Sequence, residues 1–197
     1  MADADPVVGA SPDYSGLQQH FERAGLRLEG RCLGLSQFGD HWRQTAALIE
    51  DMTAAESDIL GERMPMLHAR AGQCLITQGE VGEWMLLLLE GTVDVVKRGD
   101  SGAASRLAVV KAGASIGEMS MLDSAPRNAS CIAIEDVRAG VLTRAAIAVL
   151  IQEHPAISAK ILVKLTQLLA QRLRNTSNRL VKLMQQQQIE IDPTELA

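Results

Sequence analysis

The 197-residue sequence has little cysteine and no long apolar run. Its three cysteines, Cys32, Cys74 and Cys131, are odd in number and far apart, whereas zinc sites and disulfide frameworks use paired spacings. We therefore expect three free thiols. The apolar run over residues 85–89, like every other run in the sequence, is far too short to cross a bilayer, which requires about 20 residues.

Basic residues are fewer than acidic ones: the sequence has 19 Lys and Arg against 24 Asp and Glu, and the formal net charge is −5. Proteins that bind nucleic acids rely on clustered Lys and Arg, so this balance argues against broad contact with DNA. The first sixteen residues lack the basic start and apolar core of a secretory signal. We expect a cytoplasmic protein without a DNA or membrane partner.

Motifs of catalysis and metal binding are likewise missing. The histidines show neither metal-ligand spacing nor a nucleophile partner, and no P-loop or catalytic carboxylate pair is readable. The four histidines are His20, His41, His68 and His154. We therefore expect neither an enzyme nor a metal site.

In the N-terminal part of the chain, the sequence predicts a disordered start followed by helices. Residues 1–16 are acidic and rich in turn formers, and we expect them to be disordered. Residues 17–52 contain amphipathic pieces broken by glycines, and we expect a helical extension there. The sequence Thr53-Ala-Ala-Glu56 has the form of a capping box and predicts a helix that ends near Pro65.

The middle of the chain, from Leu67 to Thr143, consists of short apolar or alternating runs divided by glycines. The runs cover residues 74–77, 84–89, 93–96, 107–110, 131–134 and 140–142. This spacing is typical of an all-β barrel or sandwich. The glycines fall beside the runs, where turns need residues that tolerate positive φ.

The pattern then becomes helical. A short helix over residues 145–153 is interrupted at Pro155, and a long helix is predicted over residues 156–188, followed by a polar tail over 189–197. Seven residues of the long helix recur at alternating steps of four and three, as in a coiled-coil seam. They are Leu162, Thr166, Leu169, Leu173, Thr176, Leu180 and Leu183. We expect the second half of this seam to join two copies of the chain.

The segment from Ile116 to Ser130 carries the chemistry. Gly117 allows a close backbone approach, and Arg127 supplies a guanidinium fork suited to a phosphate. Glu118 would repel a phosphate unless it faces a neutral donor such as a ribose hydroxyl. A 3′,5′-cyclic nucleotide offers both groups within one small pocket.

These residues also form a recognisable motif. Gly-Glu-x-x-x-Leu followed by Pro-Arg-x-Ala-Ser resembles the phosphate-binding cassette of the cyclic-nucleotide-binding domain family. Residues 53–183 resemble the sensor domains of bacterial catabolite activator proteins. The resemblance implies an α+β, mainly β fold: a jelly-roll β-barrel over residues 53–155, flanked by N-terminal helices and a long C-terminal dimerisation helix.

The resemblance also implies a role for each cassette residue. Glu118 would accept the ribose 2′-hydroxyl, and Arg127 would pair with the cyclic phosphate. Backbone N–H groups near Gly117, Met119 and Asn128 would complete the phosphate cradle. Ala129, which follows Asn128 in the motif, belongs to the same ligand-binding set.

Four further residues would meet the base. Thr176 and Ser177 match an adjacent pair that touches adenine from the two subunits, and Val95 and Leu107 would line the apolar part of the base pocket. The ligand expected is cAMP. Because Asn128 replaces a small or hydroxylic residue, cGMP stays open.

Taken together, these features predict a stand-alone cyclic mononucleotide receptor without another cofactor, which signals to a partner protein through a ligand-dependent shift of its C-terminal helix. Only about ten residues follow Gln187, so we expect no helix-turn-helix domain of a transcription factor. A cGMP receptor and a ligand-free dimeric interaction module are the alternatives. A cyclic dinucleotide fits less well, because its second half would lack contacts.

Overall fold

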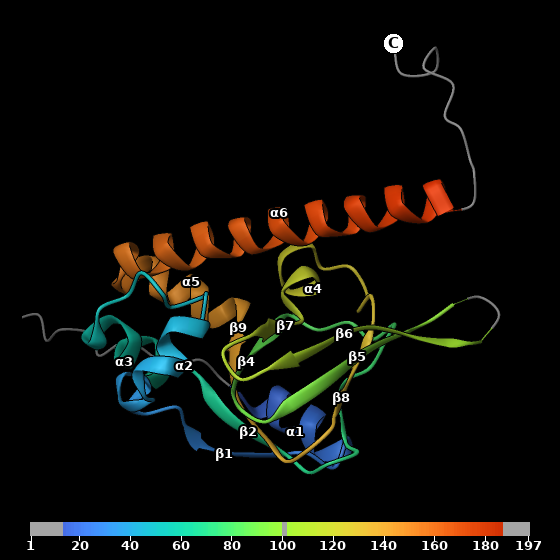
Figure 1. Ribbon diagram of the computed structural model, residues 1–197. Helices are drawn as coiled ribbons and strands as arrows, with labels where there is room; N and C mark the ends of the chain where they lie inside the picture. The colour runs from blue at the N-terminus through green and yellow to red at the C-terminus, as the bar shows by residue number, and fades with distance from the viewer. Residues whose placement is uncertain (1–13, 100–101, 187–197) are drawn as a thin grey trace, which may run out of the picture.

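In the computed structural model, residues 14–99 and 102–186 are described, and they form two antiparallel sheets flanked by helices (Figure 1). One sheet has the strand order β1-β2-β9-β4-β7, and the other has the order β3-β8-β5-β6. The strands are β1 (Arg27–Arg31), β2 (Pro65–Ala69), β3 (Cys74–Ile76), β4 (Trp84–Glu90), β5 (Thr92–Arg98), β6 (Ala104–Lys111), β7 (Ser115–Ile116), β8 (Ser130–Ala133) and β9 (Val137–Thr143). This is the predicted mainly-β, jelly-roll architecture.

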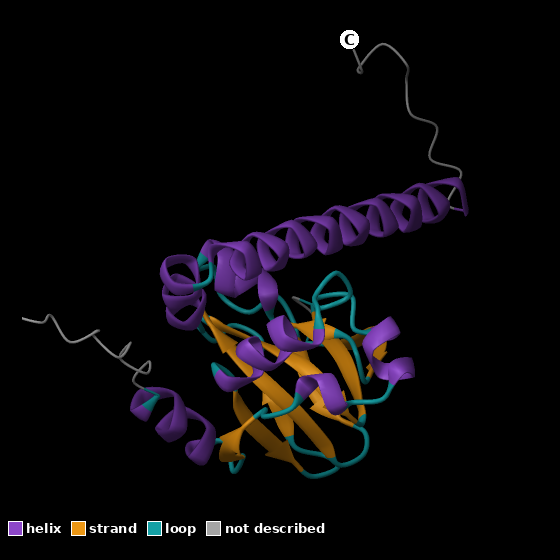
Figure 2. Cartoon of the chain, turned by 90° about the vertical axis from the view of Figure 1, so that its left-hand side faces the viewer, coloured by secondary structure: helices purple, strands orange, loops and turns teal. Residues whose placement is uncertain are grey.

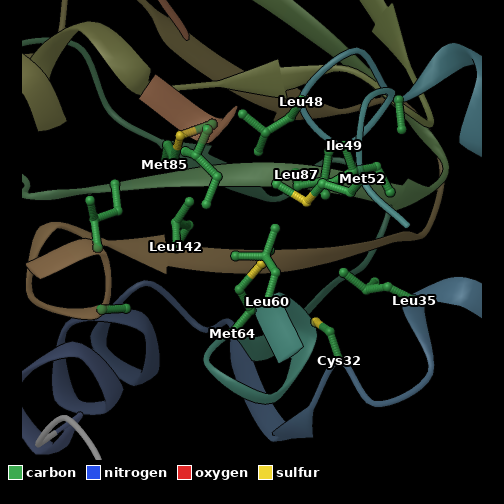
Figure 3. Close-up of a cluster of buried hydrophobic side chains, with 14 of the residues drawn as sticks. Cys32, Leu35, Leu48, Ile49, Met52, Leu60, Met64, Met85, Leu87 and Leu142 are labelled. Atoms are coloured by element: carbon green, nitrogen blue, oxygen red, sulfur yellow. The ribbon is translucent and has the colours of Figure 1, made fainter. Parts of the chain in front are cut away.

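Strand β4 is apolar over residues 84–89 because it is buried on both faces. Its even-numbered residues from Trp84 to Leu88 belong to the apolar cluster inside the barrel, and its odd-numbered residues from Met85 to Leu89 belong to a second cluster beneath the helices. Successive side chains of a strand point to opposite faces, so a strand buried on both faces must be apolar throughout. Figure 3 shows Met85 and Leu87 in the second cluster, close to Leu60 of a neighbouring helix.

The N-terminal region corrects one prediction. It contains α1 (Ser15–Arg23), the 3₁₀ turn η1 (Leu35–Gln37), α2 (Asp40–Thr45) and α3 (Ala54–Glu62), but also strand β1, which pairs antiparallel with β2. A purely helical extension over residues 17–52 was therefore wrong. Strand β1 has a single apolar residue, Leu28, and lies at the sheet edge, where backbone pairing rather than burial holds it.

The predicted capping box is confirmed at the start of α3. The Thr53 hydroxyl accepts the Glu56 N–H at 3.2 Å, and the Glu56 carboxylate accepts the Thr53 N–H at 2.7 Å. Of the predicted disordered segment 1–16, residues 1–13 lie outside the described residues, whereas Ser15 and Gly16 begin α1. The polar tail over 189–197 also lies outside them.

Helices α5 (Arg144–Glu153) and α6 (Pro155–Gln186) cover one side of the barrel (Figure 1), and in the view of Figure 2 the far end of α6 extends past the strands. Pro155 is the first residue of α6, where its missing N–H leaves no hydrogen bond unmade. The first half of α6 packs through Ile157, Ile161 and Leu165, which are at most 4% exposed. The seam residue Leu162 is 39% exposed, so this packing uses a different face from the predicted seam.

Outside the barrel, none of the helices in the described part of the chain combines the length and apolar character that a bilayer span requires.

The three cysteines are free, as predicted: Cys32 and Cys131 are buried, and Cys74 is partly exposed. Burial raises the pKa of Cys32 and of Cys131 to about 12.

Candidate functional site

The predicted cassette connects β7 to β8 and contains one short helix, α4 (Glu118–Asp123). Gly117 precedes α4 in the left-handed region, with φ of 81°, which glycine adopts without strain. A Cβ atom at this position would lie 2.8 Å from Nη1 of Arg127. Glycine therefore serves both the turn and the approach of the arginine.

Arg127 is a buried cation, 4% exposed. Its Nη1 donates to the Gly117 carbonyl at 2.6 Å, its Nη2 donates to the Trp84 carbonyl at 2.8 Å, and its guanidinium carbon lies 4.3 Å from the centroid of the Trp84 ring. Within the described ranges, no carboxylate forms an ion pair with it. Desolvation by burial lowers the pKa of Arg127, and the nearby carboxylates of Glu80 and Glu118 offset this only in part.

Glu118, the first residue of α4, is 1% exposed. Its Oε1 accepts from Nη1 of Arg172 on α6, and Nη2 of Arg172 donates to the Ser115 carbonyl at 2.7 Å. Its Oε2 is buried and has no hydrogen-bond donor among the residues that the structure describes. A buried acceptor of this kind is costly unless a donor arrives.

The other cassette members lie at the rim. The Met119 side chain is 46% exposed, and Ala129 is half-buried. Asn128 is exposed, and its Oδ1 accepts from Nζ of Lys97 on β5 at 2.6 Å. Lys97 therefore adds a second cation at the edge of the cassette.

The four predicted base contacts lie on three elements beside the cassette, β5, β6 and α6. Val95 on β5 is half-buried, and Leu107 on β6 is 38% exposed at an irregularity opposite Val95 and Val96. Thr176 and Ser177 are exposed on α6, and neither bonds to the cassette within the described part of the chain.

The contacts of two neighbouring arginines show which side of α6 Thr176 lies on. Arg172 bonds to Glu118 of the cassette, and Arg179 donates to the Leu107 carbonyl at 3.2 Å. Residues at i, i+4 and i+7 share one face of a helix, so Thr176 lies on the barrel-facing side between these two contacts. Ser177, one residue further, is turned about 100° away.

Sequence reasoning missed Arg172, Trp84 and Lys97. Arg172 stands four residues, about one helical turn, before Thr176, and this spacing was a usable signal. No sequence signal marks Trp84, because its partner Arg127 is 43 residues away. The same holds for Lys97, which meets Asn128 across 31 residues.

The groups that the structure brings together at the cassette suit the binding of a small ligand. A buried cation without a counterion and a buried acceptor without a donor flank Gly117, which suits a ligand with one anion and one hydroxyl. No group of three or more metal-ligating side chains occurs among the searched, described residues.

Known proteins resemble a large part of this chain. The model of the cyclic nucleotide-binding domain matches residues 66–154. A cyclic nucleotide-binding domain from Methylobacillus flagellatus is 31% identical, with a TM-score of 0.69 over 80% of this chain and 88% of that one. The Thermus thermophilus catabolite activator protein is 29% identical, with a TM-score of 0.64 over 70% of this chain and 62% of that one.

A curated relative, the CRP-like cAMP-activated global transcriptional regulator of Mycobacterium tuberculosis, is 32% identical over 113 residues. The match covers 57% of this chain and 49% of the relative, so the chain spans about half the length of that protein. The matched residues include the cassette with Glu118 and Arg127 within the family model. The chain belongs to the cyclic nucleotide-binding domain family.

Proposed function

We propose that the chain is a receptor for a cyclic mononucleotide, with cAMP the favoured ligand. One observation carries this proposal: among the residues that the structure describes, Arg127 is buried without an ion-pair partner and Oε2 of Glu118 is buried without a donor. Burial makes a charge without an opposite charge costly, and it makes an acceptor without a hydrogen-bond donor costly as well. A cyclic nucleotide supplies both partners, its phosphate for the cation and its 2′-hydroxyl for the acceptor.

The charge of the ligand follows from this pair. A cyclic phosphate carries one negative charge and would neutralise one guanidinium. The carboxylate of Glu118 accepts hydrogen bonds and donates none, so the group that meets it must be a neutral donor. A cyclic dinucleotide would also bring a second ribose, and the described residues of the cassette hold no second buried acceptor for its hydroxyl.

Two observations favour cAMP over cGMP. Thr176 lies on the barrel-facing side of α6, one turn beyond Arg172, where it could meet a purine edge. The relatives in Mycobacterium tuberculosis and Thermus thermophilus are named for cAMP. In this proposal Val95 and Leu107 line the apolar side of the base, and Ser177 reaches the nucleotide of a second copy.

We further propose a homodimer joined through α6. Leu173, Leu180 and Leu183 are 69%, 57% and 56% exposed, an apolar stripe that a partner helix would cover. Ligand would favour one position of the helix, and an unidentified effector protein would read it. The proposed receptor is cytoplasmic, is not an enzyme, needs no cofactor beyond its ligand and has neither DNA nor membrane as its partner.

Isothermal titration with cAMP, cGMP and cyclic di-GMP tests the ligand. We expect cAMP to bind, and we expect Arg127→Gln and Glu118→Gln to weaken binding at least tenfold, the loss of about one charged hydrogen bond. The controls Arg70→Gln and Glu62→Gln change the same charges at exposed positions and should bind as the unaltered chain does. Binding of none of the three nucleotides would favour the interaction-module alternative, and binding of cGMP alone would overturn the preference for cAMP.

Sedimentation velocity tests the dimer. The double variant Leu180→Asp and Leu183→Asp should sediment as a monomer, because charges on a covered apolar stripe are strongly unfavourable. Leu33→Asp, at a residue that is 67% exposed between β1 and η1, is the matched control. Dimers that persist in the double variant would place the interface elsewhere.

A further inference from the structure

Trp84 stands between the cassette and the N-terminal helix. It is the first residue of β4 and is 6% exposed. Its ring carries the guanidinium of Arg127 at 4.3 Å, and it also contacts two rings of α1, Phe21 at 4.7 Å and His20 at 5.8 Å between centroids. Trp84 therefore contacts Arg127 directly, and Phe21 and His20 contact Trp84.

Helix α1 is part of the barrel core. Phe21 is fully buried in the same apolar cluster as Trp84 and Leu86, and Leu26, just beyond the helix, is 1% exposed there. In both views α1 lies on the side of the barrel away from α6 (Figures 1 and 2). The helix thus reaches the cassette through the barrel interior, on a route that does not involve α6.

A second route joins α1 to the backbone of Arg127. Nε2 of His20 lies 4.0 Å from the carboxylate of Glu80. The Glu80 carbonyl accepts the Arg127 N–H at 2.7 Å, and the Arg127 carbonyl accepts the Gly79 N–H at 2.9 Å. The backbone and the side chain of Arg127 therefore both rest on residues that α1 contacts.

The guanidinium also has little room to move. A Cβ atom at Gly82 would lie 2.5 Å from Nη2 of Arg127, and one at Gly117 would lie 2.8 Å from Nη1. Two carbonyls and the Trp84 face hold it as well. Its position therefore depends on where the Trp84 ring is held.

We propose that Trp84 is a positioning residue for Arg127, and that α1 sets the anion affinity of the cassette by fixing the Trp84 ring. This inference rests on the proposed function, since the anion is the phosphate of the nucleotide. Helix α1 touches no predicted ligand contact directly. Linkage requires the effect to be reciprocal: a partner that displaces α1 weakens nucleotide binding, and nucleotide holds α1 in place.

Titration of full-length variants with cAMP and cGMP tests the first step. Trp84→Leu removes the ring face and should weaken both nucleotides about tenfold and equally, because they share the phosphate. Trp84→Phe keeps a face for the guanidinium and should recover most of the affinity. Trp42→Phe, which alters the other tryptophan in the other apolar cluster, is the matched control and should leave affinity unchanged.

A double-variant cycle separates positioning from general loosening. In an Arg127→Lys background, where no planar guanidinium remains to stack, Trp84→Leu should weaken binding by less than threefold. An undiminished tenfold effect would overturn the role through Arg127. A changed ratio of cAMP to cGMP affinity would overturn it as well, because it would place Trp84 against the base.

The α1 step is tested by His20→Ala, which leaves the buried Phe21 in place. It should weaken both nucleotides several-fold, while Arg23→Ala on the exposed side of α1 should not. Equal affinities for these two variants would overturn the involvement of α1.

A ligand-free arm distinguishes this inference from the proposed function. If the unaltered chain binds no nucleotide, the proposed function fails. Thermal unfolding of the ligand-free variants then tests whether Trp84 and Arg127 are coupled energetically. A Tm loss in Trp84→Leu with Arg127→Lys that is smaller than the sum of the single losses supports the coupling, and a simple sum overturns it.

Discussion

The two members of the Glu118–Arg172 pair should differ in what their removal costs, because only one of them is buried. The side chain of Glu118 is 1% exposed, whereas that of Arg172 is 43% exposed. Arg172→Gln leaves a desolvated carboxylate whose Oε2 already lacks a donor. Breaking a buried ion pair from one side costs about 3–5 kcal/mol, and solvent screening at Arg172 reduces the expected loss to about 2–3 kcal/mol.

Glu118→Gln removes the buried charge instead. The amide keeps an acceptor oxygen for Arg172, which also retains the Ser115 carbonyl at 2.7 Å and access to water. The expected loss in the free energy of unfolding is below about 1 kcal/mol. One contact should therefore yield two costs that differ by about 2 kcal/mol, with the arginine variant the less stable.

Ligand-free thermal and urea unfolding measure this difference. For a chain of this size 1 kcal/mol corresponds to about 2–4 °C in Tm, so Arg172→Gln should lose about 4–12 °C. Arg27→Gln and Glu29→Gln remove the members of an exposed ion pair, 68% and 46% exposed, and should each cost less than about 1 kcal/mol. Equal losses for Glu118→Gln and Arg172→Gln would refute the burial argument.

Three further predictions concern single residues. Gly82→Ala should weaken cAMP binding, measured by titration, because its Cβ would displace the Arg127 guanidinium. The hydrogen bond from Lys160 and the helix cap lower the pKa of Glu56, so its stabilisation is present above pH 4.5 and is lost as the pH falls through the folded value; Glu56→Gln should flatten that part of an acid unfolding curve. A thiol reagent at pH 8 should modify only Cys74 in the folded chain, because burial raises the pKa of the other two thiols to about 12.

The apolar pattern predicted most of the sheet because most strands are buried on at least one face. Strand β4 is apolar at nearly every position, and its bounds follow the run from Trp84 to Leu89 closely. Strand β1 escaped prediction because an edge strand with one apolar residue has no periodic pattern. Strand β7, with two residues, is too short to show any period.

Some residues of the candidate site could be predicted from the sequence, and others could not. Glu118 and Arg127 were identified because their types and spacing sit in one contiguous motif. Arg172 and Trp84 act on that motif across 54 and 43 residues, and only the fold brings them there. The seam on α6 shows the limit of periodicity: its residues Leu173, Leu180 and Leu183 are exposed, and the residues that pack on the barrel, such as Ile161, lie on a neighbouring face.

Helix α6 is held firmly at one end only, and this bears on how a bound ligand could act. Its first half is fixed by Ile161 and Leu165 in the core and by ion pairs of Lys160 with Glu56 at 2.6 Å and of Lys164 with Asp51 at 2.8 Å. Beyond Leu165, its hydrogen bonds to the barrel within the described residues come from two arginines, of which Arg172 ends on Glu118. A ribose hydroxyl on Oε2 would share that carboxylate with the helix, so occupancy of the cassette would bear on the distal half of α6 while the first half stays in place.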